Sequence, residues 1–136
     1  MLANVEVVYG TMTERERLVR TMLNATEEEL YFDISSSVHG KPMFPTSRSK
    51  MIEKGRQWFE QKHADLATAI CSQISLRNLA RQDVPTHELV VSICGTLDLG
   101  VHTLGGAPVV TVAVLIVRLG LHKFCAAFWS DPPTSA

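Results

Sequence analysis

The segment PVVTVAVLIVRLGLHKFCAAF, at residues 108–128, is the apolar part of the chain around which the other elements must pack. Its first half is rich in β-branched side chains, which suit a buried strand. The apolar pattern nevertheless continues for about 20 residues, which is long for a strand and ordinary for a central helix that is apolar on every side. We therefore expect a helix, and a buried strand over residues 109–117 is the alternative.

A second apolar segment precedes this one and predicts a partner helix over residues 86–104. Its apolar side chains recur at steps of three and four residues; they are Leu89, Val90, Ile93, Leu97, Val101 and Leu104. The pattern ends at Gly105-Gly106, which is typical of a helix C-terminus. Pro108 follows in the first turn of the next element, where proline is tolerated. The two segments together predict a hydrophobic C-terminal helical hairpin.

The N-terminal part of the chain carries two helix-start signals of the form Thr-x-x-Glu. They begin at Thr13 and Thr26. In such capping boxes the threonine hydroxyl and the glutamate carboxylate satisfy backbone N–H groups that have no partner within the helix. The motifs predict helices over residues 13–24 and 27–36.

A long amphipathic segment follows an irregular loop at residues 35–46. It predicts a helix from about residue 47, a break at residues 72–75 and a short helical continuation to residue 79. Gly55 lies on the apolar face of this helix, where the missing side chain allows a neighbouring helix to approach closely. Together these elements predict a mostly α protein, a single compact bundle of four to five helices with the hydrophobic hairpin at its C-terminal end.

The size and composition of the chain support one domain. It has 136 residues and a 46% apolar share, enough for a core without help from metals or disulfides. We assign residues 1–129 to a single helical domain and residues 130–136, SDPPTSA, to a disordered tail. Residues 1–10 lack the basic and apolar regions of a signal peptide.

Charge is distributed unevenly along the chain. The formal net charge of -1 excludes a globally basic nucleic-acid binder. Residues 1–40 nevertheless carry three basic and seven acidic side chains, and residues 41–82 carry eight basic and three acidic ones. Trp58 and Phe59 lie within the basic segment, an arrangement that weakly favours single-stranded nucleic acid as a partner. On a helix they belong to the apolar face, so we expect core packing instead.

The cysteines give no sign of a covalent or metal framework. Cys71, Cys94 and Cys125 are odd in number and form no C-x-x-C pair. Each lies in an apolar stretch, where a free cysteine behaves as a small hydrophobic residue. We expect reduced core thiols in a cytoplasmic protein, with no metal site and no cofactor.

Between residues 89 and 121 of the predicted hairpin, the apolar pattern is interrupted by the ionisable side chains of Asp98, His102 and Arg118. Asp98 and His102 are four residues apart and share a helix face. A metal site there would lack a third ligand. If the chain folds back near residue 106, the long side chain of Arg118 reaches Asp98. We therefore predict a partly buried Asp98–Arg118 pair, with His102 nearby, that holds the two helices in register.

The sequence RQWFEQKH, residues 56–63, places Arg56 and His63 two helical turns apart on one face. This spacing resembles the R-x4-6-H motif of the HEPN superfamily, small helical domains of which many cut RNA. The resemblance covers eight residues. It implies that His63 acts as a general base on a ribose 2′-hydroxyl and that Arg56 stabilises the phosphate, in a site that usually forms across a dimer.

The rest of the chain carries no coherent catalytic set, so we expect a non-enzymatic helical protein–protein interaction or adaptor module. Its partner is another protein or a second copy of itself, recognised through the segregated acidic and basic surfaces. The predicted contact residues are the basic side chains and the two last aromatic residues of the core segment: Lys50, Lys54, Lys62, Phe128 and Trp129.

Two other functions are the alternatives. The first is a HEPN-like ribonuclease that uses Arg56 and His63. The second is a membrane-active helical hairpin at residues 88–121. Its longest uninterrupted apolar run, residues 107–117, is shorter than the roughly 20 residues that cross a bilayer, which disfavours a membrane partner.

Overall fold

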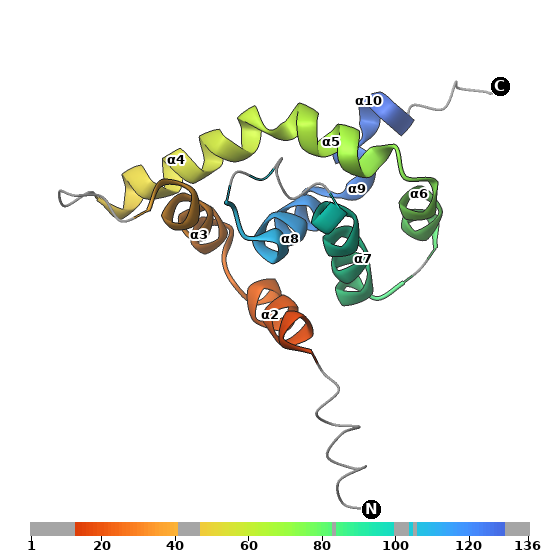
Figure 1. The fold of residues 1–136 in the computed structure, drawn as a ribbon, viewed down its shortest axis with the longest axis horizontal. Coiled ribbons are helices and arrows are strands. Elements are labelled where there is room, and N and C mark those ends of the chain that lie inside the picture. Colours follow the sequence, from red (N-terminus) through yellow and green to blue (C-terminus); the bar gives the residue numbers. More distant parts are fainter. Residues whose placement is uncertain (1–12, 41–46, 83, 100–103, 105, 130–136) are drawn as a thin grey trace, which may run out of the picture.

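The computed structural model of this chain describes residues 13–40, 47–82, 84–99, 104 and 106–129. Within these residues the regular structure is entirely helical, in nine helices labelled α2 to α10 (Figure 1). The predicted mostly α class is confirmed. The described residues contain more helices than the four to five predicted, because two of the expected long helices are interrupted.

The first two helices are α2 (Glu14–Leu23) and α3 (Glu27–His39). The hydroxyl of Thr13 accepts a hydrogen bond from a backbone N–H in the first turn of α2, at 3.1 Å. At α3 the capping box is complete, since the Thr26 hydroxyl and the Glu29 carboxylate each accept from the other residue's backbone N–H, at 3.1 and 2.8 Å. These bonds hold the pKa of Glu29 below its usual value. Both predicted helix starts are confirmed.

Helices α4 (Arg48–Gln61), α5 (His63–Cys71) and α6 (Ile74–Arg81) follow. Only Lys62 separates α4 from α5, and its backbone is close to helical, so the two helices run as one bent rod across the molecule (Figure 1). The predicted break at residues 72–75 is confirmed between α5 and α6. The interruption at Lys62 was not predicted.

Gly55 is the point of closest approach between α3 and α4. A Cβ atom added at Gly55 would lie 1.9 Å from the backbone carbonyl oxygen of Tyr31. Glycine therefore allows a contact between the two backbones that every other residue would prevent. Beside this contact the rings of Tyr31 and Phe59 pack edge to face, with their centroids 6.3 Å apart. The expected close approach at Gly55 is confirmed.

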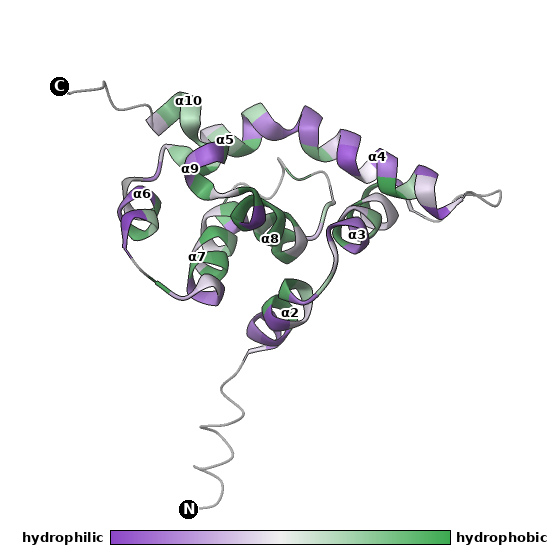
Figure 2. Cartoon of the chain, turned by 180° about the vertical axis from the view of Figure 1, so that it is seen from behind, coloured by the Kyte–Doolittle hydropathy of each residue, from purple (hydrophilic) through white to green (hydrophobic). Residues whose placement is uncertain are grey.

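The apolar hairpin consists of α7 (Thr86–Leu99) and α8 (Val109–Leu119). Residues 110–116 of α8 are all buried, which shows that this helix is enclosed on every side. It contacts α2, α3, α7 and α9. Figure 2 shows the strongly hydrophobic α8 and α7 at the centre of the fold and a largely hydrophilic α4 at its edge. The helix predicted over residues 109–117 is confirmed, and the strand alternative is excluded.

Gly120 ends α8. Its φ of 95° lies in the left-handed region, which residues with a Cβ rarely adopt, so the helix stops there. Two four-residue helices follow, α9 (Leu121–Phe124) and α10 (Ala126–Trp129). The single C-terminal helix predicted from the apolar pattern is therefore divided into three. No helix in the described parts of the chain has the length and apolar character needed to cross a membrane.

Candidate functional site

The carboxylate of Asp98 binds a different arginine from the one predicted. Arg15, at the start of α2, donates to both of its oxygens: Nη2 donates to Oδ1 at 3.1 Å, and Nη1 contacts Oδ2 more closely. The two side chains are 38% and 42% exposed, so the pair lies at the surface. The prediction of a partly buried Asp98–Arg118 pair is therefore wrong. His102 lies outside the described residues.

Arg118 binds the C-terminal end of α2, the helix that begins beside Arg15. Its Nη2 donates to the backbone carbonyl of Leu23 at 2.8 Å and to that of Ala25. Carbonyls at a helix C-terminus have no partner within the helix, and a cationic side chain satisfies them well. The prediction failed because α2 packs against both α7 and α8 and supplies the partner for each charge. The prediction used only the spacing of residues within the hairpin, which does not indicate that α2 packs against it.

We predict that Asp98→Ala lowers the free energy of unfolding by less than about 1 kcal/mol at neutral pH, because exposed ion pairs contribute little. The hydrogen bonds from Arg15 hold the pKa of Asp98 below its usual value. The contribution of the Arg15–Asp98 pair to the free energy of unfolding is therefore fully present above the pKa of Asp98 in the unfolded state, about 4. It is lost as the pH falls through the lower pKa of Asp98 in the folded state. Urea unfolding at pH 7 and pH 3 measures it, and a loss of about 3 kcal/mol at pH 7 would instead indicate a buried pair.

Arg56 is held by its own helix and by α3. Its Nη1 donates to Oε2 of Glu53 at 2.8 Å, and its guanidinium lies over the ring of Tyr31, 5.2 Å from the centroid. Burial raises the pKa of Tyr31 to about 12. These contacts fix Arg56 at the α3–α4 contact, and it does not line the groove that His63 lines.

His63 is the first residue of α5, seven residues beyond Arg56 near the middle of the α4–α5 rod. Its Nε2 lies 3.1 Å from the carbonyl oxygen of Phe124, and because a carbonyl only accepts, Nε2 carries the proton. The imidazole also stacks on the Phe124 ring, with centroids 4.3 Å apart and planes within 6°. These contacts fasten the start of α5 to α9. The structure thus gives Arg56 and His63 separate partners within the chain.

A groove runs between the α4–α5 rod and the two last helices, with a volume of about 370 Å³. Its lining is predominantly apolar and comprises Glu60, Gln61, His63, Ala64, Ala67, Phe124, Ala127 and Phe128. We call these eight residues the α5–α10 face. Phe128 stands at its edge with 49% of its surface exposed. The structure therefore brings His63 and Phe128, both singled out from the sequence, to one surface.

Trp129, the other predicted aromatic contact residue, is buried, so its predicted role as an exposed anchor is wrong. It is 8% exposed, and its indole N–H donates to the backbone carbonyl of Cys71 at 2.7 Å. Its ring also meets the edge of His122, with centroids 5.5 Å apart. Trp129 thus holds α10 against the end of α5 and leaves Phe128 outward.

A disulfide joins the two chain segments that supply the walls of the groove. Cys71, the last residue of α5, is bonded to Cys125, between α9 and α10, with their Cα atoms 5.5 Å apart. The expectation that these cysteines are reduced core thiols is therefore wrong. Cys94 is the free thiol of the described residues, and burial raises its pKa to about 11. Sequence reasoning missed the bond because 54 positions separate the two cysteines and the odd total suggested no pairing.

The predicted basic contact residues lie on the α4–α5 rod. Lys50 and Lys54 are exposed, one helical turn apart on α4, and Lys62 at the junction is partly buried. A smaller hollow of about 260 Å³ next to Lys54 is lined by His39, Lys54, Gln57, Trp58 and Gln61. Lys50 and Lys54 therefore present positive charge to solvent before the groove residues begin, whereas Lys62 lies between Gln61 and His63, which both line the groove.

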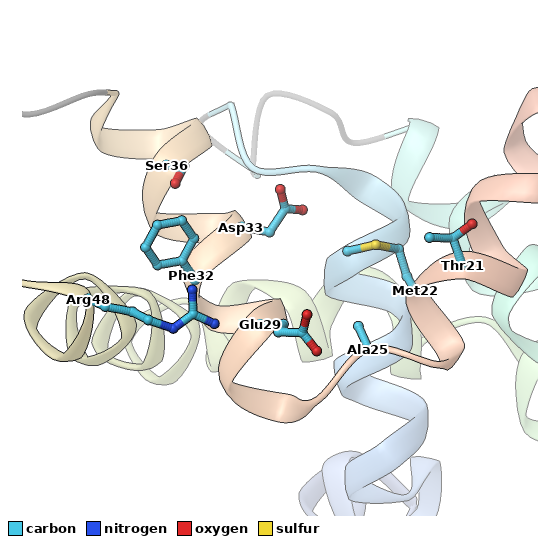
Figure 3. A pocket seen from close by; sticks show the side chains of 8 residues that line it. All are labelled: Thr21, Met22, Ala25, Glu29, Phe32, Asp33, Ser36 and Arg48. Atoms are coloured by element: carbon cyan, nitrogen blue, oxygen red, sulfur yellow. The ribbon is translucent and has the colours of Figure 1, made fainter.

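A second open pocket of about 400 Å³ lies between α2, α3 and the start of α4 (Figure 3). Its charged groups are engaged within the protein. Glu29 caps α3, Asp33 accepts a hydrogen bond from Thr111 at 2.6 Å, and the Arg48 guanidinium lies 5.0 Å from the centroid of Phe32. The pocket is thus a junction of three helices, and its charged side chains, Glu29, Asp33 and Arg48, already contact other residues of the chain.

Comparisons of this chain with protein-family models, with curated proteins and with solved structures found no match. The described residues contain no group of three or more His, Cys, Asp and Glu side chains that could hold a metal ion. Among the features described above, the α5–α10 face combines an apolar hollow with an exposed aromatic side chain. It is therefore the best candidate for a binding surface.

Proposed function

We propose that this chain is a non-enzymatic helical protein-interaction module that pairs with a second copy of itself through the α5–α10 face. The observation that carries the proposal is the position of Phe128, half-exposed beside an apolar groove that the chain itself leaves open. Aromatic side chains next to pockets are the residues that dominate binding energy at protein interfaces.

A second copy fits this face because the face complements itself. A two-fold interface uses the same patch on both partners, so the patch must carry both a projection and the hollow that receives it. Here the projection is Phe128 and the hollow is the groove beside it. Glu60, which lines the groove, and Lys123, which adjoins the lining residue Phe124 in sequence, are exposed charges of opposite sign. Opposite charges on one patch allow each copy to offer the other a complementary charge.

The contacts of the HEPN-like residues favour a binding role over catalysis. Nε2 of His63 donates to a backbone carbonyl and its ring stacks on Phe124, which ties the imidazole to α9 and leaves only Nδ1 for general-base catalysis. Arg56 is bound to Glu53 and covers Tyr31, so its guanidinium serves the contact between α3 and α4. The proposed function therefore rests on the exposed α5–α10 face.

We predict that Phe128→Ala weakens self-association at least about tenfold, the loss typical of an aromatic side chain central to an interface. The mass of the non-reduced protein, followed by light scattering over a concentration series, measures the dissociation constant. Leu119→Ala is the matched control, since Leu119 is 40% exposed at the end of α8 and does not line the groove. A wild-type chain that stays monomeric at all concentrations would overturn the pairing.

The salt dependence of self-association distinguishes pairing through the α5–α10 face from the pairing predicted from charge alone. Association between the lysine-rich surface of α4 and the acidic N-terminal segment would weaken markedly at high salt, because exposed charges are then screened. Association centred on Phe128 persists, because apolar burial does not depend on counter-charges. Lys50→Ala, a change in the predicted basic contact surface, is expected to leave the dissociation constant unchanged. An adaptor role toward other proteins and a cytoplasmic location stay predictions.

A further inference from the structure

The Cys71–Cys125 disulfide joins the two walls of the α5–α10 face. On one wall Cys71 follows Ala67 by one helical turn, and on the other Cys125 comes directly after Phe124. Both Ala67 and Phe124 line the groove. The covalent bond therefore fixes the separation of the two walls of the groove that Phe128 also lines.

Helix α10 has little of its own to hold it in place. It has four residues, far fewer than a helix needs to be stable by itself in water. It contacts α5 and α9, and its hydrogen bond from Trp129 to the Cys71 carbonyl ends at the same residue that forms the disulfide. Its other ties are the buried Trp129 ring with its contact to His122, and the backbone bonds of Phe128 and Trp129 to the carbonyl of Cys125, the second cysteine of the bond.

We propose that Cys71 and Cys125 form a reversible redox site that controls the α5–α10 face. The disulfide form holds α10 against α5 and presents the groove with Phe128. The dithiol form releases α10 and removes the groove. This inference rests on the proposed function, because it makes self-association depend on oxidation of the two thiols.

The reductant is a dithiol, and the exchange proceeds in two steps. Cys71 and Cys125 are both buried, 5% and 0% exposed, so the dithiol reaches the bond when α10 opens, and one of its thiolates then attacks Sγ of Cys71. The S–S bond breaks, and its electron pair leaves on Sγ of Cys125, which then takes a proton. The second thiol of the dithiol attacks the mixed disulfide, freeing the thiol of Cys71. The dithiol becomes a disulfide, and two electrons and two protons pass to the protein.

The Cys71–Cys125 bond lies next to a small peripheral helix, which favours its reversible reduction. Trp129 holds α10 against the end of α5, and it belongs to the four-residue helix at the edge of the described structure. Opening a small peripheral unit costs much less free energy than unfolding the core. In a reducing compartment, such as the predicted cytoplasm, disulfides are typically transient and redox-sensing. The Cys71–Cys125 bond therefore has both a route for attack and a consequence for the surface above it.

The test compares the full-length wild type with and without a dithiol reductant, each state verified by intact mass and thiol alkylation. Light scattering measures self-association, and hydrogen exchange measures protection of α10. We expect reduction to weaken self-association at least tenfold and to abolish protection of α10, while α8 stays protected. Cys94→Ser, which leaves the disulfide in place, is expected to respond to reductant as the wild type does. Cys71→Ser/Cys125→Ser is expected to behave as the reduced protein with or without reductant.

The outcomes distinguish the two proposals. If both redox states associate equally and Phe128→Ala weakens both, the redox site is overturned and the interaction module stands. If neither state associates, the pairing is overturned, and hydrogen exchange alone decides the redox site. Unchanged protection of α10 on reduction overturns it, and selective loss supports it. Reduction of the wild type needs no substitution, so the test holds even if the double variant does not fold.

Discussion

Gly55→Ala is expected to destabilise the protein by about 2 kcal/mol, within the range for overpacking a close contact. The new Cβ would lie 1.9 Å from the Tyr31 carbonyl oxygen, a backbone atom that no rotamer change can move. Helices α3 and α4 must therefore separate, which loosens Tyr31 and Phe59 along the same contact. Urea unfolding followed by circular dichroism measures the loss.

Gly95→Ala is the matched control for this substitution. Gly95 lies within α7, and a Cβ placed there meets nothing within 4 Å. Replacing an exposed helical glycine with alanine stabilises a helix by about 0.5–1 kcal/mol. The same chemical change is thus expected to have opposite signs at the two positions. A stabilising effect at Gly55 would contradict the close contact between α3 and α4.

The second large effect is expected from Cys71→Ser/Cys125→Ser. The disulfide closes a loop between residues 54 positions apart, and the chain-entropy model assigns such a cross-link about 4 kcal/mol. The double variant should therefore unfold at a clearly lower denaturant concentration than the oxidised wild type. Denaturant titrations of both proteins, with and without reductant, measure the difference.

The reductant supplies the control for this prediction. Reduced wild type should unfold close to the double variant, because both lack the cross-link. The midpoint of the variant should be the same with and without reductant. A wild-type midpoint that is also insensitive to reductant would contradict a cross-link in the protein as it exists in solution.

Features set by neighbouring residues were predictable from the sequence. The Thr26 capping box, the apolar face that carries Gly55 and the helical character of residues 109–117 all depend on spacings of a few residues. The structure confirms each of them. Local spacing also predicted a hairpin, which α7 and α8 form.

Features that join distant elements were not predictable in the same way. Arg15 binds Asp98 across 83 positions, and the cysteine bond spans 54. Each requires knowing which helices lie side by side. Phe128 and Trp129 are neighbours in sequence, yet the sequence did not show which of the two is buried. They point about 100° apart on a helix, and the packing of α10 against α5 leaves Trp129 buried and Phe128 half-exposed.

Both ends of α2 are fastened to the hairpin: Arg15 binds Asp98 of α7, and the carbonyl of Leu23 accepts a hydrogen bond from Arg118, 95 positions away. During synthesis on the ribosome α2 emerges long before either partner exists. Val19, its buried residue, has no core to enter until α8 has been made. Helix α2 is therefore translated well before its packing partners, and it can bury Val19 only after the hairpin has left the exit tunnel.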